Sequence, residues 1–109
     1  MDERSGQGGA VGAATVTFDA AGVPVIALTG EIDISNVASL RATIEPIVET
    51  APERVVFDLT GLDFIDSSAV ALLLHAAAKT RSVSLRQPST IVRRILEVSG
   101  LTEVLRIDA

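Results

Sequence analysis

The middle of the chain changes from a short apolar run to a long helical segment. Residues 55–59 (VVFDL) are a continuous run of β-favouring residues, which predicts a strand buried on both faces. Residues 67–79 are helix formers with no Asp, Glu, Lys or Arg before the last turn, which predicts a helix. Asp66, Ser67 and Ser68 stand at this change, and short polar residues of this kind cap helix N-termini. The pattern therefore places a serine in the first turn of a helix, directly after a buried strand.

The segments on either side predict the rest of a sheet. Residues 14–18 alternate between polar and apolar positions, which is typical of a half-buried edge strand. Residues 19–22 have the composition of a hairpin turn, so residues 23–29 should return antiparallel. We also expect strands at 82–86 and 104–107. The fold class is therefore α/β, with a mixed sheet of four to five strands, an antiparallel edge strand and helices packed on the sheet.

Two further segments have helical spacing. Val37, Leu40 and Ile44 begin an apolar stripe that predicts a helix, but Pro46 removes a backbone donor and crowds the preceding turn. We therefore expect a kink or an early end near Ile44. A third helix is predicted to start at residues 88–90.

Composition limits the possible function classes. Of the 109 residues, 48% are hydrophobic, which is enough to build the core of one domain. The formal net charge of −5 argues against a nucleic-acid surface, and no apolar run is long enough to span a membrane. Residues 1–12 are rich in glycine and charge, so we expect a disordered tail before a domain at 13–109. A cytoplasmic location is the expectation.

Catalysis finds little support in the sequence. His75 is the single histidine, and eight helical residues would separate it from Ser67 by about 12 Å, beyond hydrogen-bond reach. There is no cysteine, and the sequence has no phosphate-binding glycine motif. One histidine among scattered carboxylates does not indicate a metal site. We therefore expect no enzyme activity, no metal and no cofactor.

Three short sequence segments together resemble one protein family. The segment LTGLDFIDSSAV at 59–70 resembles the phosphorylation loop of STAS domains, the family that includes the anti-sigma factor antagonists. The segment LTGEID at 28–33 is similar to that family's second strand and its following turn, and SGL at 99–101 to its closing turn. The resemblance covers about residues 14–107, and the spacing of the blocks is more specific than any one of them. The sequence ends at Ala109, about where many relatives begin a last helix, so that helix has no expected counterpart here.

The resemblance implies roles for particular residues. Ser67 matches the phosphorylated serine, with Ser68 as the weaker candidate. The residues expected to border the partner are Glu31, Asp33, Asp66, Ser67, Ser68 and Ala69. Ala69 replaces a glycine that is common in the family. The alternative interpretation is helix capping alone at residues 66–68, and turn or cap chemistry alone at Asp58 and Asp63.

The function implied by the resemblance is that of an anti-sigma factor antagonist. The unmodified form would bind an anti-sigma factor with a histidine-kinase-like ATPase fold and so release a sigma factor. A serine kinase, often the anti-sigma factor itself, would phosphorylate Ser67, and a serine phosphatase would reverse the modification. The chain would be a monomer or weak dimer. The alternatives are a STAS module of a larger assembly, such as a lipid-transporter subunit or a stress-sensing complex, and a domain that senses a nucleotide near Asp66.

Overall fold

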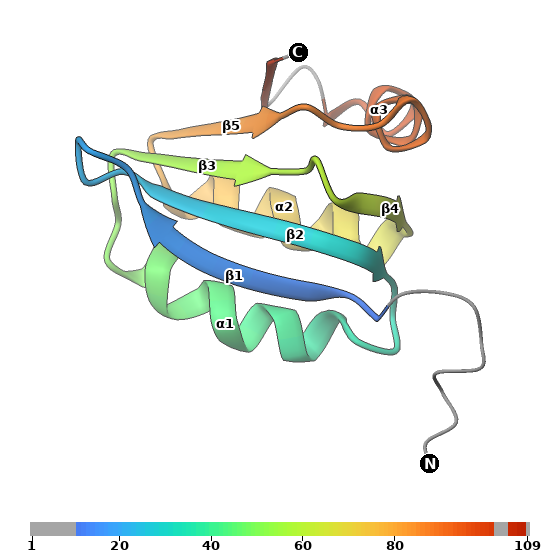
Figure 1. Ribbon diagram of the computed structural model, residues 1–109, viewed down its shortest axis with the longest axis horizontal. Helices are drawn as coiled ribbons and strands as arrows, with labels where there is room; N and C mark the ends of the chain where they lie inside the picture. The colour runs from blue at the N-terminus through green and yellow to red at the C-terminus, as the bar shows by residue number, and fades with distance from the viewer. Residues whose placement is uncertain (1–10, 102–104, 109) are drawn as a thin grey trace.

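The computed structural model describes residues 11–101 and 105–108, which form a mixed sheet with helices against it (Figure 1). The strands are β1 (Ala13–Phe18), β2 (Pro24–Ile32), β3 (Arg54–Asp58), β4 (Leu62–Ile65), β5 (Ser82–Arg86) and β6 (Arg106–Asp108). The main path of the sheet is β1-β2-β3-β5-β6, and β4 pairs with β2 outside this path. β1 is antiparallel to β2 and the other pairs are parallel, so the predicted α/β class with an antiparallel edge strand is confirmed.

The helices of the described residues share one core with the sheet. They are α1 (Val37–Glu49), α2 (Ser67–Lys79) and α3 (Thr90–Val98). Figure 1 shows α2 behind the sheet, α1 along β1 and α3 beside β4. Each helix contributes buried residues to a single hydrophobic cluster: Leu40, Ile44 and Val48 from α1, Leu72 and Leu73 from α2, and Val92 and Leu96 from α3.

β3 is an interior strand, as the sequence predicted. It pairs in parallel with β2 on one side and β5 on the other. Val55, Val56 and Phe57 are all buried, and Phe57 is fully inaccessible to solvent. A strand with neighbours on both edges and both faces covered needs apolar residues at successive positions, which explains the uninterrupted run.

The short strand β4 was not predicted, and it determines where the polar residues after it lie. Glu31 pairs with Phe64, and Ile32 with Ile65, so β4 continues alongside the end of β2. Gly61 allows this close approach, because a Cβ there would lie 2.9 Å from Cγ2 of Thr29. The backbone N–H of Asp66 then donates to the carbonyl of Ile32. As a result, the N-terminus of α2 lies next to the turn between β2 and α1.

The predicted early end of the first helix is wrong. α1 continues through Pro46 to Glu49. Ala42, whose carbonyl would normally accept the missing N–H at Pro46, is exposed, so water can satisfy that carbonyl. Ile44 and Val48 are buried on either side of the proline, and their burial holds both parts of the helix against the core.

The two ends of the chain differ from the expected boundaries in small ways. Residues 1–10 of the predicted tail lie outside the described residues, whereas Val11 forms a β-bridge with Glu31. The predicted closing strand at 104–107 is found as β6, at Arg106–Asp108. No helix within 11–101 is long and apolar enough to cross a membrane.

Candidate protein-interaction site

Asp66 is the N-cap of α2. Its Oδ1 accepts hydrogen bonds from the backbone N–H groups of Ser68 (2.9 Å) and Ala69 (3.2 Å), and from the hydroxyl of Ser68. These donors belong to the first turn of the helix, where no intrahelical carbonyl can accept from them. The capping interpretation of the sequence is therefore confirmed for Asp66.

The second carboxylate oxygen of Asp66 has a different partner. Oδ2 accepts from the backbone N–H of Ile34, in the turn between β2 and α1, at 3.0 Å. The hydroxyl of Ser68 makes the largest contribution to holding the pKa of the Asp66 carboxyl below its usual value, and the N–H groups of Ala69, Ile34 and Ser68 add to it against the opposing effect of burial. One ionised side chain thus joins two segments that are far apart in sequence.

The two serines have different environments. Ser67 is the first residue of α2 and is exposed. Ser68 is half-buried, and its hydroxyl donates to Asp66. Of the two hydroxyl groups, that of Ser67 is the accessible one.

The remaining predicted site residues fall into two groups. Glu31 and Asp33 are half-buried at the end of β2, close to Asp66 in space because β4 pairs with this end of the strand. Asp33 organises the turn, since its Oδ1 accepts from the backbone N–H of Ser35 at 2.9 Å. Ala69, by contrast, is only 3% exposed and belongs to the core, so its side chain is not available to a partner.

Exposed apolar side chains lie on the segments next to Ser67: the turn between β2 and α1, β4 and α2. Ile34 and Phe64 are 76% and 43% exposed, and on α2 Ala71 and Leu74 follow Ser67 at helical spacing on the exposed side. We call the set Ile34, Phe64, Ser67, Ala71 and Leu74 the switch face. These side chains belong to segments that meet at Asp66, and exposed apolar side chains on a surface are typical of a protein-interaction site.

Within the part of the chain that the structure describes, the side chains of Asp58 and Asp63 make no hydrogen bond to Asp66 or to the switch face. Asp58 accepts from the backbone N–H and the hydroxyl of Thr60, and these bonds, the hydroxyl first, lower the pKa of its carboxyl. This is ordinary turn chemistry. Asp63 is exposed on β4.

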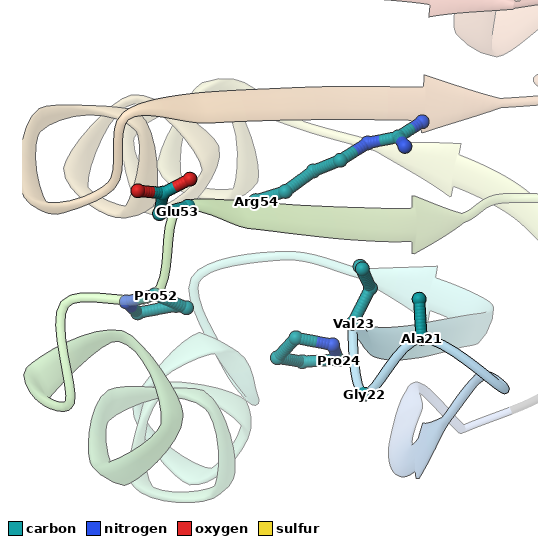
Figure 2. A pocket seen from close by; sticks show the side chains of 7 residues that line it. All are labelled: Ala21, Gly22, Val23, Pro24, Pro52, Glu53 and Arg54. Atoms are coloured by element: carbon teal, nitrogen blue, oxygen red, sulfur yellow. The ribbon is translucent and has the colours of Figure 1, made fainter.

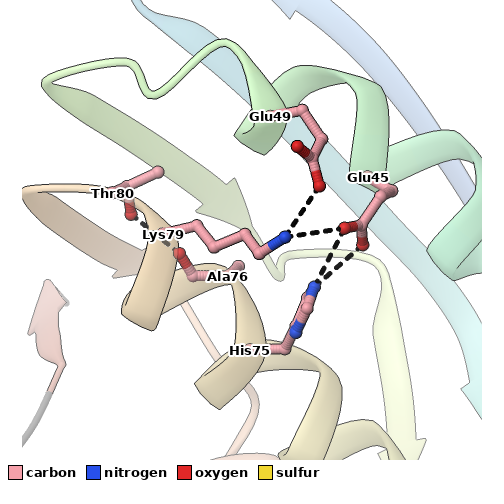
Figure 3. Close-up of polar contacts among 6 residues, drawn as sticks. All are labelled: Glu45, Glu49, His75, Ala76, Lys79 and Thr80. Carbon is pink, nitrogen blue, oxygen red and sulfur yellow. Dashed lines mark hydrogen bonds and ion pairs between the residues drawn. The ribbon is translucent and has the colours of Figure 1, made fainter.

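A charged cluster between α1 and α2 accounts for His75. Nε2 of His75 lies 2.8 Å from Oε1 of Glu45, and the ammonium group of Lys79 contacts both Glu45 and Glu49 (Figure 3). The side chain of His75 therefore points to α1, and the residue is half-buried. This cluster was not predicted, although Glu45 and Glu49 are spaced by four residues, as are His75 and Lys79.

An open hollow lies at the other end of β2. It is lined by Ala21, Gly22, Val23, Pro24, Pro52, Glu53 and Arg54 (Figure 2). The length of β2, which runs from Pro24 to Ile32, separates it from Asp66. Within the described ranges, no group of His, Asp or Glu side chains is arranged to hold a metal ion.

Comparison with known proteins identifies the family. Residues 16–106 match the family model described as "Mlab, STAS domain". The chain is 36% identical to the anti-sigma-F factor antagonist RsfA of Mycobacterium tuberculosis, over 76% of this chain and 70% of that protein. It is 35% identical to the anti-sigma F factor antagonist of Lysinibacillus sphaericus, over 71% of this chain and 70% of that protein.

Solved structures of SpoIIAA, an anti-sigma factor antagonist of Bacillus, agree with these matches. The unphosphorylated form is 29% identical, with a TM-score of 0.73 over 89% of this chain and 88% of that one. The phosphorylated form is 28% identical, with a TM-score of 0.66 over 89% and 91%. The names of these relatives describe regulatory antagonists rather than enzymes, in line with the expectation of a binding module. Since the family model spans most of the sequence, and these relatives match over more than two thirds of both chains, the chain belongs to the STAS domain family.

Proposed function

We propose that this chain is an anti-sigma factor antagonist that phosphorylation of Ser67 switches off. The observation that carries the proposal is the placement of Ser67: an exposed hydroxyl at the start of α2, directly after the capping Asp66 and within an exposed apolar face. The names of the relatives support the antagonist role, and the existence of SpoIIAA in a phosphorylated form supports the switch.

The unmodified chain would bind an anti-sigma factor with an ATPase fold through the switch face, with Glu31 and Asp33 at its border. Binding would withhold the anti-sigma factor from its sigma factor. A serine kinase, which can be the anti-sigma factor itself, would modify Ser67, and a serine phosphatase would restore the hydroxyl. We expect this exchange to take place in the cytoplasm, where transcription factors are regulated.

The physical basis of the switch is a local change of charge. A phosphoserine carries about −1.5 to −2 charges, and the positive end of a helix dipole tolerates them at the first turn of α2. The fold can therefore persist. At the interface, one like charge on the partner at about 7 Å costs about 2 kcal/mol at an effective dielectric constant near 20. About 1.4 kcal/mol is a factor of ten in affinity, so a single acidic neighbour weakens binding by more than tenfold.

The decisive experiment is a pull-down from the native cytoplasm with wild-type chain and Ser67→Glu, read by mass spectrometry. We expect wild type to capture an ATPase-fold protein that Ser67→Glu does not capture. Ser67→Ala is the matched control and should capture it as wild type does, because it removes the acceptor without adding charge. Capture of transporter subunits by all three forms would contradict the proposal and favour a module of a larger assembly.

A further inference from the structure

We propose that Asp66 is a positioning residue that couples phosphorylation of Ser67 to the way Ile34 is presented to the partner. The inference deepens the proposed function and rests on it. It concerns a single carboxylate whose two oxygens serve two different segments: the start of α2 and the turn between β2 and α1.

The turn between β2 and α1, which carries Ile34, is held mainly by hydrogen bonds among its own residues and the end of β2. Oδ1 of Asn36 accepts from the N–H of Asp33 at 3.0 Å, and the amide of Asn36 donates to the carbonyl of Glu31 at 2.9 Å. Among the described residues, Ile34 donates its own N–H across to Oδ2 of Asp66. That bond fixes the backbone of Ile34 relative to the first turn of α2, and so fixes where its side chain projects.

Ile34 is the most exposed of the three large apolar residues of the switch face, with 76% of its surface accessible to solvent against 43% for Phe64 and 39% for Leu74. A large apolar side chain held in water by an ordered backbone is suited to enter an apolar pocket on a partner. The contribution of Ile34 to binding depends on how firmly its backbone is held. A mobile residue loses conformational entropy when it binds, whereas a residue that is already fixed does not.

Phosphorylation of Ser67 puts a second anion next to the Asp66 carboxylate. Oδ1 of Asp66 already accepts from the N–H groups of Ser68 and Ala69, which are the donors that a phosphoryl group at this position would attract. Competition for these donors, together with repulsion between the two anions, favours movement of the Asp66 side chain. The hydrogen bond from the N–H of Ile34 to Asp66 is then lost, while the phosphoryl group keeps a negative charge at the N-terminus of α2.

Replacement of Asp66 by asparagine separates the two roles. Asparagine is as good an N-cap as aspartate, so its single oxygen can keep the bonds to Ser68 and Ala69. The other position becomes an NH₂ group, which cannot accept from the N–H of Ile34. Asp63→Asn is the matched control: it makes the same change of charge on an exposed residue of β4 whose side chain makes no hydrogen bond with the described residues.

The test is backbone amide exchange of Ile34 with water, measured by NMR on the whole chain. Four forms are compared: wild type, Asp66→Asn, Asp63→Asn, and chain carrying phosphoserine at position 67 by genetic encoding. We expect exchange of the Ile34 amide to be at least tenfold faster in Asp66→Asn and in the phosphorylated chain than in wild type and Asp63→Asn. The melting temperature of Asp66→Asn should stay close to that of wild type, which a merely structural role would not allow.

Binding to the ATPase-fold protein captured by wild type supplies the second readout. Asp66→Asn should bind it at least tenfold more weakly than Asp63→Asn does. Unchanged Ile34 exchange in the phosphorylated chain, or undiminished affinity of Asp66→Asn, would overturn the coupling and leave the proposed function standing. Equal affinity of the phosphorylated and unmodified chains would instead refute the proposed function itself.

Discussion

Nε2 of His75 lies 2.8 Å from Oε1 of Glu45, so the histidine of α2 is directed to α1 and away from Ser67. A general base must reach the proton that it removes, and His75 faces a carboxylate on another helix instead. We therefore expect His75→Ala to keep full affinity for the protein partner, with a small loss of thermal stability from the missing hydrogen bond to Glu45. Titration calorimetry and a thermal melt check the two expectations. A hydrolytic activity present in wild type and lost in His75→Ala would bring back a catalytic role.

The same cluster predicts a dependence of stability on pH. A side-chain hydrogen bond with Glu49, followed by those with the Lys79 ammonium and His75, lowers the pKa of Glu45 from 4.5 to about 2. Because the pKa is lower in the folded state, the contribution of Glu45 is fully present above about pH 4.5 and is lost as the pH falls to about 2. Urea unfolding across this window should show a smaller acid-induced loss of stability for Glu45→Gln than for wild type.

The control for this effect is Glu97→Gln. Glu97 is exposed on α3 and forms no ion pair with a described residue, so its replacement should leave the acid-induced loss as in wild type. Equal pH dependence of wild type and Glu45→Gln would show that the cluster between α1 and α2 does not form in solution.

Two phenylalanines in strands provide a test of the core. Phe57 in β3 is fully buried, whereas Phe18 in β1 is 61% exposed. Phe57→Ala should lower the free energy of unfolding by about 3–5 kcal/mol, because it removes buried surface and leaves a cavity. Phe18→Ala should cost less than about 1 kcal/mol, as is usual for surface substitutions. Urea titration measures both. Similar losses for the two variants would mean that β3 is not the centre of the core.

Much of this fold could be predicted from local patterns. The buried run at 55–59 predicted β3, which is found one residue earlier at Arg54–Asp58, and the helix formers at 67–79 predicted α2 with its observed bounds. Period and length distinguish a strand from a helix. Pro46 led to the wrong prediction that the first helix ends early. The energetic cost of a proline in a helix depends on whether water can reach the carbonyl that loses its hydrogen bond. That exposure is set by the whole fold and not by the local sequence. The alternation at 14–18 predicted a half-buried strand, yet Phe18 is exposed near the end of β1.

The identity of the main site residues could be predicted from the sequence, but their arrangement in space could not. Ser67 and the capping Asp66 follow from residue types and the resemblance to the family. The bond between Asp66 and Ile34 does not, because it joins residues 32 positions apart. It depends on the pairing of β4 with the end of β2, a non-local contact that no local pattern encodes. Ala69 was included from the family motif alone, and only the packed structure shows that its side chain is in the core.

The last prediction concerns which serine accepts the phosphoryl group. Ser67 is exposed and comes directly after Asp66, whereas the hydroxyl of Ser68 is half-buried and donates to Asp66. A kinase acting on Ser68 would have to break that bond at a half-buried residue, whereas Ser67 is exposed. We therefore expect phosphopeptide mapping by mass spectrometry, after incubation with the cognate kinase and ATP, to find the modification at position 67. Ser68→Ala should still be modified and Ser67→Ala should not. Modification of Ser67→Ala at position 68, at the rate of wild type, would contradict the mechanism, because it would show that the bond to Asp66 does not protect Ser68.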